Sequence, residues 1–268
     1  MNASLPTIAI LGAGSMGGAI LSGLRTHGAD ARITTRSAAS AANVAGAVST
    51  EADERANANA VAGAKVVLLG VKPLMVGDLL REIAPALAAD AIVVSLAVGV
   101  TSAAMEAVVP VSVVRAMPNT PSLVGRGVTG LAAGSRTSAA DLDLVTAIFE
   151  TVGDVLVVPE GQMDALSTIS GSGPAYVFLL IEELTRAAIE LGFTPEQAAL
   201  MVNGTFRGAS ELLASSQSAP ADLRRKVTSP KGTTERAIAV LQEADLSGLF
   251  TLAARAALAR AKELAEST

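Results

Sequence analysis

The chain has 268 residues, of which 50% are hydrophobic and 17% are charged, and its formal net charge is −5. This acidic balance argues against a nucleic-acid partner, which a basic stripe would bind, and gives no electrostatic reason to sit on an anionic membrane. The sequence has no cysteine and a single histidine, His27, which excludes disulfides, thiolate catalysis and multi-histidine metal sites, so no bound metal is expected.

The N-terminal segment is not typical of a secretory signal peptide, because it lacks a positively charged region and passes directly into a glycine motif. No stretch of about 18 apolar residues is free of polar or helix-breaking residues, so no membrane span is expected. The sequence therefore predicts a soluble cytoplasmic protein.

Short β-branched apolar runs alternate with helical patterns through the first half of the chain. Such alternation predicts an α/β fold, in which a parallel sheet carries helices on both of its faces. Strands are expected at 7–11, 31–35, 65–70, 91–96, 111–116, 128–133 and 154–158, and helices at 16–27, 37–47, 74–87, 101–108 and 138–151.

The sequence after Gly161 is rich in alanine and leucine and shows helical periodicity, with no clear strand. Thr194 is placed to cap a helix whose first position is Pro195. These helices carry more apolar surface than a lone helical domain can bury, which predicts a crossed helical homodimer. Further helices are expected at 174–191, 220–227, 233–243 and 246–265.

The segment G-A-G-S-M-G matches the G-x-G-x-x-G pattern, directly after a predicted strand and at the start of a predicted helix. In this pattern Gly12 permits the tight turn, Gly14 lets a diphosphate approach the backbone, and Gly17 lets the helix pack closely on the strand. The N–H groups at the start of the helix, including those of Ser15 and Met16, would bind the phosphates. The sequence therefore predicts a dinucleotide site here.

The end of the second predicted strand indicates which dinucleotide binds. An NAD site usually places Asp or Glu there, about 20 residues beyond the glycines, to bind the ribose 2′-hydroxyl. This chain has Thr35, Arg36 and Ser37 instead. A carboxylate would repel a 2′-phosphate, whereas hydroxyls and a guanidinium bind one. The sequence therefore predicts NADPH as the cofactor, with Arg36 as the charged clamp and NADH as the alternative.

Turn-forming residues follow three further predicted strands, at the edge where open α/β sheets bind ligands. Lys72 is expected near the ribose or the phosphate, and the amide of Asn119 near the nicotinamide carboxamide. We expect this edge to complete the cofactor site of a Rossmann-type dinucleotide-binding domain over residues 1–160. The expected cofactor contacts in these loops are Val71, Lys72, Pro73, Ala97 and Asn119.

The order and spacing of several motifs resemble those of the pyrroline-5-carboxylate reductase family. The similarity covers nearly the whole chain, and its most specific motifs are S-G-S-G-P-A-Y at 170–176 and S-P-K-G-T-T at 229–234. The other matching segments are 12–17, 71–73, 95–100 and 117–121. The resemblance implies an all-α domain for dimerisation and substrate binding over residues 161–268, in homodimers that often assemble into larger rings.

The resemblance also implies an activity, the reduction of 1-pyrroline-5-carboxylate to L-proline with NAD(P)H as the last step of proline biosynthesis. In that family the turn before a helix holds the carboxylate of the imino acid substrate. By this likeness, Ser229, Gly232 and Thr233 contact the carboxylate, and the hydroxyl of Thr234, the catalytic residue, meets the ring nitrogen. Lys231 stands where the family often has glycine, and lysine is strained there if the position needs a positive φ.

The chain has few candidates for the acid–base catalyst of an alcohol dehydrogenase, which agrees with imine reduction. An alcohol dehydrogenase needs a group that takes the hydroxyl proton, commonly histidine, lysine or tyrosine. His27 ends the first predicted helix, away from the sheet edge, and the single tyrosine, Tyr176, is expected to pack in an apolar helix. A cyclic imine can carry its proton as an iminium, so hydride addition needs orientation more than acid–base help.

The residues leave two other functions open. A 3-hydroxyacid dehydrogenase shares the two-domain plan, but its Lys-x-x-x-Asn motif is missing, because Lys226 is followed by Val, Thr, Ser and Pro. A non-catalytic dinucleotide-binding protein would keep the fold, but it would not need the substrate-binding turn at 229–234.

Overall fold

The structure is a computed structural model that describes residues 5–266, and these form two compact units. The first unit runs to Ser172 and includes the described residues from Ala257 onward, and the second is Gly173–Ala256. The chain thus divides later than the boundary expected after residue 160. The segment after that boundary groups with the first unit because Met163 is buried against Met117 and Ala132 of the sheet.

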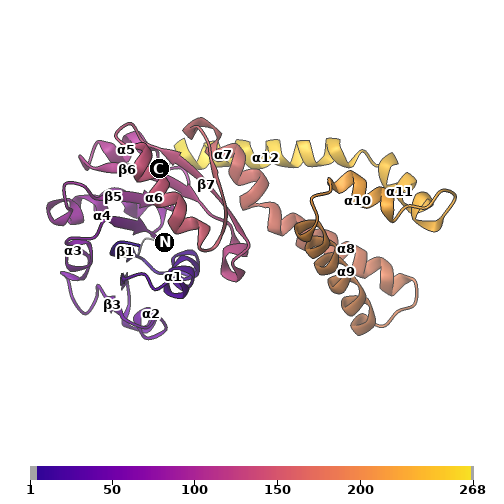
Figure 1. The fold of residues 1–268 in the computed structure, drawn as a ribbon, viewed down its shortest axis with the longest axis horizontal. Coiled ribbons are helices and arrows are strands. Elements are labelled where there is room, and N and C mark those ends of the chain that lie inside the picture. The colour runs from indigo at the N-terminus through magenta and orange to yellow at the C-terminus, as the bar shows by residue number, and fades with distance from the viewer. Residues whose placement is uncertain (1–4, 267–268) are drawn as a thin grey trace. The chain divides into compact units, whose positions relative to one another are not determined.

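A single sheet carries the fold of the first unit (Figure 1). Within residues 5–266 its eight strands lie in the order β3-β2-β1-β4-β5-β6-β7-β8. The strands are β1 (Ile8–Leu11), β2 (Ala31–Thr35), β3 (Ala47–Ser49), β4 (Val66–Leu69), β5 (Ile92–Ser95), β6 (Ser112–Met117), β7 (Gly127–Ala133) and β8 (Gly153–Val157).

The prediction of a parallel sheet is wrong for one pair of strands, because β6 and β7 pair antiparallel. The connection between the two strands is short and consists mainly of a 3₁₀ turn, η3 (Thr120–Val124), followed by Gly125 with a φ of 68°. A parallel pair needs a crossover of a dozen or more residues, which this connection is too short to provide. The other neighbouring strands are parallel, as predicted.

Helices cover both faces of the sheet, as predicted, and each face has its own apolar core. Ile8 and Ile10 of β1 point into the core beneath α1 (Ser15–Thr26) and α6 (Ala139–Glu150). Their neighbours in β1 point into the core beneath the helices of the opposite face, because side chains alternate along a strand. The helices of that face are α3 (Ala56–Val61), α4 (Val76–Ile83) and α5 (Ser102–Glu106).

Two predicted helices of the first unit are shorter in the structure. The helix expected at 37–47 is only α2 (Ala38–Ala42), and the short β3 and α3 that follow it were not predicted. The helix expected at 74–87 is α4 flanked by 3₁₀ turns, η1 (Pro73–Met75) and η2 (Ala84–Ala86). The second of these turns contains Pro85, which lacks the N–H that a continuing α-helix would use.

The second unit is helical, as predicted. The cap of α9 was foreseen: Thr194 Oγ1 accepts from the N–H of Gln197 at 3.3 Å, and the Gln197 side chain accepts from the N–H of Thr194 at 3.1 Å. Tyr176 packs its ring against Phe250, with centroids 6.2 Å apart. The helices are α8 (Gly173–Glu190), α9 (Pro195–Ser215), α10 (Pro220–Lys226), α11 (Thr233–Glu243) and α12 (Leu246–Glu266), which ends in the first unit.

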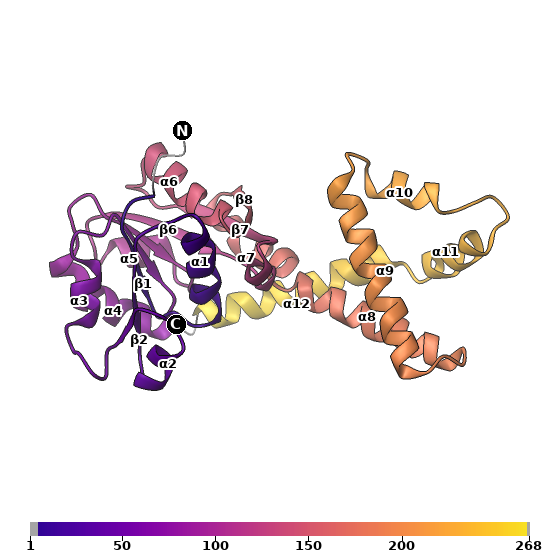
Figure 2. The same ribbon diagram turned by 60° about the horizontal axis from the view of Figure 1, so that its bottom comes forward.

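Large apolar side chains of this unit remain exposed in the single chain. Phe178 of α8 is 60% exposed and Leu200 of α9 is 77% exposed, although both helices pack side by side in Figures 1 and 2. Exposed apolar area of this extent marks a surface that a partner covers. The other members are Val177, Leu179, Leu180, Leu184, Ile189, Leu191, Phe193, Met201, Leu212, Leu213, Val227, Val240, Leu241, Leu246, Leu249, Phe250 and Leu252.

Among residues 5–266, no single helix meets the length and hydropathy needed to cross a membrane, whereas α11 and α12 taken as one pair, bent by 45°, do.

Candidate active site

The glycine turn after β1 has the geometry that its sequence pattern requires. Gly12 has a φ of 87°, and a Cβ added there would come within 3.0 Å of the carbonyl oxygen of Gly70. A Cβ on Gly17 would come within 3.0 Å of the carbonyl oxygen of Gly12, so α1 lies close to the turn. Position 12 therefore requires glycine for two reasons: L-residues avoid its positive φ, and a Cβ there would crowd the carbonyl of Gly70.

The start of α1 presents N–H groups that no earlier carbonyl of the helix can accept. Gly14 is the N-cap, and Ser15, Met16 and Gly17 are the first helical residues, with no acidic side chain in this turn. An added Cβ on Gly14 would meet no protein atom within 4 Å. Packing within the chain therefore does not require glycine at position 14, whereas the close approach of a diphosphate would. The turn fits the phosphates of a dinucleotide.

Gly70 is a further requirement of this turn, beyond the glycines of the motif. A Cβ on Gly70 would lie 2.3 Å from the carbonyl oxygen of Gly12, and the Gly70 N–H donates to the carbonyl of Leu11 at 2.8 Å. The sequence placed Gly70 only at the end of the strand expected at 65–70. Its contact with a residue 58 positions earlier exists only because β1 and β4 are neighbours in the sheet.

The strand register brings the predicted cofactor loops to one edge of the sheet. Leu11 at the end of β1 pairs with Thr34 of β2 and with Leu69 of β4, and Leu69 pairs with Ser95 of β5. The loops after these parallel strands therefore leave the sheet at the same level. This is the edge at which open α/β sheets bind ligands.

The end of β2 fixes the backbone of Arg36 and leaves its side chain exposed. The carbonyl of Arg36 accepts from the N–H of Glu51 at 3.1 Å and from Ser49 Oγ at 3.0 Å. Its guanidinium has no hydrogen-bond or ion-pair partner among the residues that the structure describes. Thr35 is buried, and the Ser37 hydroxyl caps α2 by accepting from the N–H of Ser40 at 3.2 Å. The guanidinium is thus available to a ligand.

A buried chain of polar side chains beside β2 was missed in the sequence. Thr34 Oγ1 donates to Asn57 Oδ1 at 2.7 Å, and Asn57 Nδ2 donates to Glu82 Oε1 at 3.0 Å. Asn57 is only 7% exposed, so these bonds satisfy an amide that would be costly to bury alone. They join β2, α3 and α4 behind the cofactor edge. Nothing local to Asn57 in the sequence signals these partners.

The loops after β4 and β5 place their expected residues at different depths. Lys72 is exposed and immediately precedes η1, which begins with Pro73, and Val71 is half-buried. Ala97 is 6% exposed, and its N–H donates to Ser95 Oγ at 3.2 Å. Lys72 is therefore free to reach a ligand with its ammonium group, whereas Ala97 and Val71 can offer only close van der Waals contact.

Asn119 uses its amide within the protein. Its Nδ2 donates to the carbonyl of Ser170 at 2.9 Å, and its Oδ1 accepts from the N–H of Val128 at 2.8 Å. The residue is 7% exposed. One N–H and one acceptor lone pair of the amide remain for other partners.

The start of α11, directly after the turn at 229–232, offers a second set of N–H groups without a partner in the helix. The N–H of Gly232 donates to the carbonyl of Ser229 at 3.0 Å, and a Cβ on Gly232 would lie 2.9 Å from that same oxygen. Thr233 and Thr234 begin the helix with exposed side chains and with N–H groups that lack a carbonyl partner within it. Such a helix start binds a carboxylate well.

Lys231 has the positive φ, 60°, on which its expected strain depended. Its N–H donates to Glu235 Oε2 at 2.8 Å, and this bond ties the turn to the first turn of α11. Its position in the sequence motif could not show this φ, because lysine itself does not favour one.

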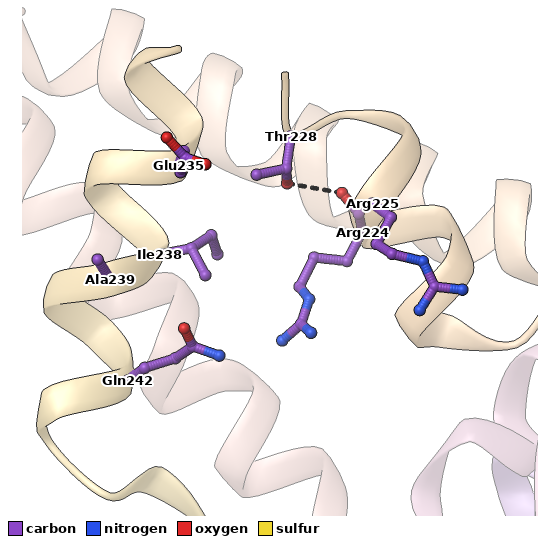
Figure 3. Close-up of a pocket in the computed structure, with 7 residues that line it drawn as sticks. All are labelled: Arg224, Arg225, Thr228, Glu235, Ile238, Ala239 and Gln242. Carbon is purple, nitrogen blue, oxygen red and sulfur yellow. Dashed lines mark hydrogen bonds between the residues drawn. The ribbon is translucent and has the colours of Figure 1, made fainter. Parts of the chain in front are cut away.

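A groove of about 260 Å³ lies beside this turn, between α10 and α11 (Figure 3). Arg225 is paired with Asp222, whereas Arg224 points its guanidinium into the space between the helices. The positive charge raises the local concentration of anions near the turn. The lining residues are Arg224, Arg225, Thr228, Glu235, Ile238, Ala239 and Gln242.

Known protein families match both the N-terminal and the C-terminal part of the chain. A family model described as pyrroline-5-carboxylate reductase dimerisation matches residues 160–264, and one described as NADP oxidoreductase coenzyme F420-dependent matches residues 7–99. The chain is 42% identical to the pyrroline-5-carboxylate reductase of Pseudomonas aeruginosa, over 98% of each chain.

Solved structures agree with these matches over nearly the whole chain. A pyrroline-5-carboxylate reductase from Coxiella burnetii is 37% identical, with a TM-score of 0.88 over 97% of this chain and 99% of that one. The pyrroline carboxylate reductase of Plasmodium falciparum, solved with NADP bound, is 25% identical, with a TM-score of 0.82 over 98% of this chain and 100% of that one.

The fold, the glycine turn and the matched regions define a two-domain NADP-linked oxidoreductase whose helical part is a dimerisation domain. The chain belongs to the pyrroline-5-carboxylate reductase family. This membership confirms the resemblance predicted from the sequence motifs.

Proposed function

We infer that this chain reduces 1-pyrroline-5-carboxylate to L-proline with NADPH, the last step of proline biosynthesis. The family membership over the full length supports this activity. The observation that carries it is the start of α11, where free N–H groups and threonine hydroxyls form a site for a small carboxylate. An enzyme of this kind also needs a dinucleotide site, and the glycine turn after β1 fits one.

The cofactor half of the site uses the edge of the sheet. Gly12, Gly14, Ser15, Met16 and Gly17 hold the diphosphate at the start of α1. The exposed guanidinium of Arg36 binds the 2′-phosphate beside Thr35 and Ser37, which favours NADPH over NADH. The remaining proposed contacts along the edge are Val71, Lys72, Pro73, Ala97 and Asn119.

The substrate half of the site lies in the second unit. Ser229, Gly232 and Thr233 hold the carboxylate of the imino acid, and the hydroxyl of Thr234 contacts its ring nitrogen. Arg224 in the neighbouring groove increases the attraction of the carboxylate. The contact from Thr233 includes its backbone N–H at the start of α11, and such a group keeps its charge distribution at every pH.

The reaction needs orientation more than acid–base catalysis. When bound at the start of α1, the cofactor would supply a hydride for the carbon of the C=N bond, and the nitrogen, protonated as an iminium, would become the amine of proline. The residues at 229–234 hold and orient the imino acid, and orientation of this kind contributes several kcal/mol. Within residues 5–266 no group of three or more His, Asp or Glu side chains gathers as a metal site would need.

The two other functions left open by the residues are disfavoured by the same observations. A 3-hydroxyacid dehydrogenase would need its lysine motif, and a non-catalytic binder would have no use for the turn at 229–234. Oxidation of a 3-hydroxyacid with NADP⁺, or tight NADPH binding without turnover of the imine, would favour them.

The exposed apolar helices support a homodimer through the dimerisation domain. We also propose that dimers assemble into a larger ring and that the enzyme works in the cytoplasm. The absence of cysteine fits a reducing compartment. Sedimentation of the purified protein would test the ring, because a dimer as the largest species contradicts it.

The proposed activity is tested by following NADPH oxidation with 1-pyrroline-5-carboxylate, with NADH in parallel. Thr234→Ala should lower kcat/KM for the imine about tenfold or more, since it removes a hydrogen bond to a charged group. The dissociation constant of NADPH should change by less than about twofold, and Thr234→Ser should retain most activity. Unchanged kinetics in Thr234→Ala would remove this hydroxyl from the site.

A further inference from the structure

The turn at 229–232, directly before α11, has a backbone conformation that one of its residues does not favour. The N–H of Gly232 donates to the carbonyl of Ser229 at 3.0 Å, which closes a four-residue β-turn with Pro230 second and Lys231 third. Proline in the second position and a positive φ in the third are typical of a type II turn, whose third residue is normally glycine or asparagine. Lys231 has a φ of 60° in this position. The turn therefore needs support from outside its own four residues.

This support comes from Glu235, the third residue of α11. A glutamate at this position of a helix commonly accepts from the N–H of the N-cap residue. Here the N-cap is Gly232, whose N–H already closes the turn. Glu235 Oε2 accepts instead from the N–H of Lys231 at 2.8 Å. A carboxylate is a stronger acceptor than a neutral group, so the bond favours the strained residue in its observed conformation.

Glu235 directs its carboxylate to the turn and not to the arginine of the neighbouring groove. Glu235 and Arg224 both line the groove between α10 and α11 (Figure 3). No ion pair joins these two side chains within residues 5–266, whereas the bond to the N–H of Lys231 is present. The contact that Glu235 makes is therefore one with the backbone of the turn.

We propose that Glu235 is a positioning residue, which holds the turn at 229–232 in the conformation that binds the carboxylate of the imino acid. The bond from Lys231 to Glu235 spans Thr233 and Thr234, so it fixes both threonines relative to Ser229. Without it, the positive φ of Lys231 is populated less often. The apparent affinity for a ligand falls with the fraction of molecules that are competent to bind. This role rests on the proposed function, which assigns the carboxylate to this turn.

The test combines two substitutions in the full-length protein. Glu235→Ala removes the acceptor for the N–H of Lys231. Lys231→Gly removes the need for that acceptor, because glycine adopts a positive φ without a steric penalty. The double variant carries both changes. Glu243→Ala is the matched control, since Glu243 is an exposed glutamate at the other end of α11 and its loss changes the net charge equally.

KM and kcat for the imine are measured for each variant, together with NADPH binding by direct titration. In Glu235→Ala we expect KM to rise about fivefold or more while kcat stays within about twofold, because a smaller fraction of the turns can bind. The NADPH dissociation constant should change by less than about twofold, since no proposed cofactor contact lies in α11 or its turn. In the Lys231→Gly background, Glu235→Ala should raise KM by less than about twofold. Glu243→Ala should match the parent protein.

Hydrogen exchange of the Lys231 N–H supplies a measurement that does not depend on the substrate. We expect this exchange to accelerate about fivefold or more in Glu235→Ala and to stay unchanged in Glu243→Ala. Unchanged exchange in Glu235→Ala would overturn the proposal, and so would a rise in KM that persists in full when residue 231 is glycine. A parent protein that reduced no imine would contradict the proposed function, and the exchange would still decide whether Glu235 holds the turn.

Discussion

Arg36 stands at the end of β2 with a backbone held by Ser49 and Glu51 and a guanidinium that is free for a ligand. Lys231 presents the opposite case, because its backbone adopts a φ of 60° that lysine does not favour. At the scale of single residues, the two halves of the site thus differ. The proposed cofactor half offers a charged side chain whose backbone is fixed by hydrogen bonds. The proposed substrate half offers backbone N–H groups next to a residue with an unfavourable φ.

Arg36→Ala should weaken NADPH binding about tenfold or more and leave NADH binding within about twofold, because in the proposed site the guanidinium contacts only the 2′-phosphate. Isothermal titration with each cofactor measures this. Arg260→Ala is the control, since Arg260 is an exposed arginine of α12 that pairs with Glu263. Equal losses for NADPH and NADH would dismiss the phosphate clamp.

Lys231→Gly should raise the free energy of unfolding by up to about 1 kcal/mol, because glycine adopts a positive φ without a steric penalty. Urea denaturation of both proteins measures the difference. Asp245→Gly is the contrasting variant: Asp245 has a φ of 44°, but its Oδ1 accepts from the N–H of Gly248 at 3.1 Å. Glycine at 245 loses that bond and should not stabilise the protein. A destabilised Lys231→Gly would contradict the assignment of strain.

At the scale of elements, short polar links hold helices and loops to the sheet. Glu106 at the end of α5 accepts from Ser135 Oγ at 2.7 Å and from the N–H of Arg136 at 3.2 Å. The hydrogen bond from Ser135 is the main reason why the pKa of Glu106 lies below its usual value, and the N–H and charge of Arg136 act in the same direction. This carboxylate ties α5 to the loop between β7 and α6.

The lowered pKa makes this link depend on pH. A carboxyl group whose pKa is lower in the folded state stabilises the fold above its unfolded pKa, and this contribution is lost as the pH falls through the folded value. Glu106→Gln should therefore lower the free energy of unfolding by up to about 1 kcal/mol near neutral pH, and by less at about pH 3. Urea denaturation at both pH values tests this, with the exposed Glu54→Gln as control. A difference that grows toward acid would contradict it.

At the scale of the whole molecule, the helical unit leaves unburied apolar surface that a single chain cannot cover. The exposed side chains of α8 and α9 belong to the matched dimerisation domain. Burial of apolar area contributes about 25 cal/mol per Å², so covering these helices would stabilise the dimer substantially. The fold of the second unit and the assembly are therefore coupled.

Phe178→Asp should convert the dimer to monomers, because a carboxylate would be buried in an apolar interface without a partner. Analytical ultracentrifugation measures the mass, and imine reduction should fall with it. Val48→Asp is the control, because Val48 is 45% exposed on β3, an edge strand of the sheet in the first unit, outside the dimerisation domain. A dimer of unchanged affinity in Phe178→Asp would exclude this face of α8 from the interface.

Features that depend on neighbours along the chain were determined by the sequence itself. The glycine turn, the cap at Thr194 and the alternation of strands and helices all follow from residues within a few positions of one another. The family motifs likewise identified the site residues as candidates, whose roles stay predictions. Local rules suffice for these features because the interactions that produce them span less than two helical turns.

Only the tertiary structure decided which distant residues meet. Gly70 lies against Gly12 because β1 and β4 are neighbours, and Asn119, in the loop after β6, donates to the carbonyl of Ser170, 51 positions away. The antiparallel pairing of β6 and β7 belongs with them. A one-dimensional pattern records each residue's own preference, whereas these contacts arise from the order of strands in the sheet, which is set by packing over the whole unit.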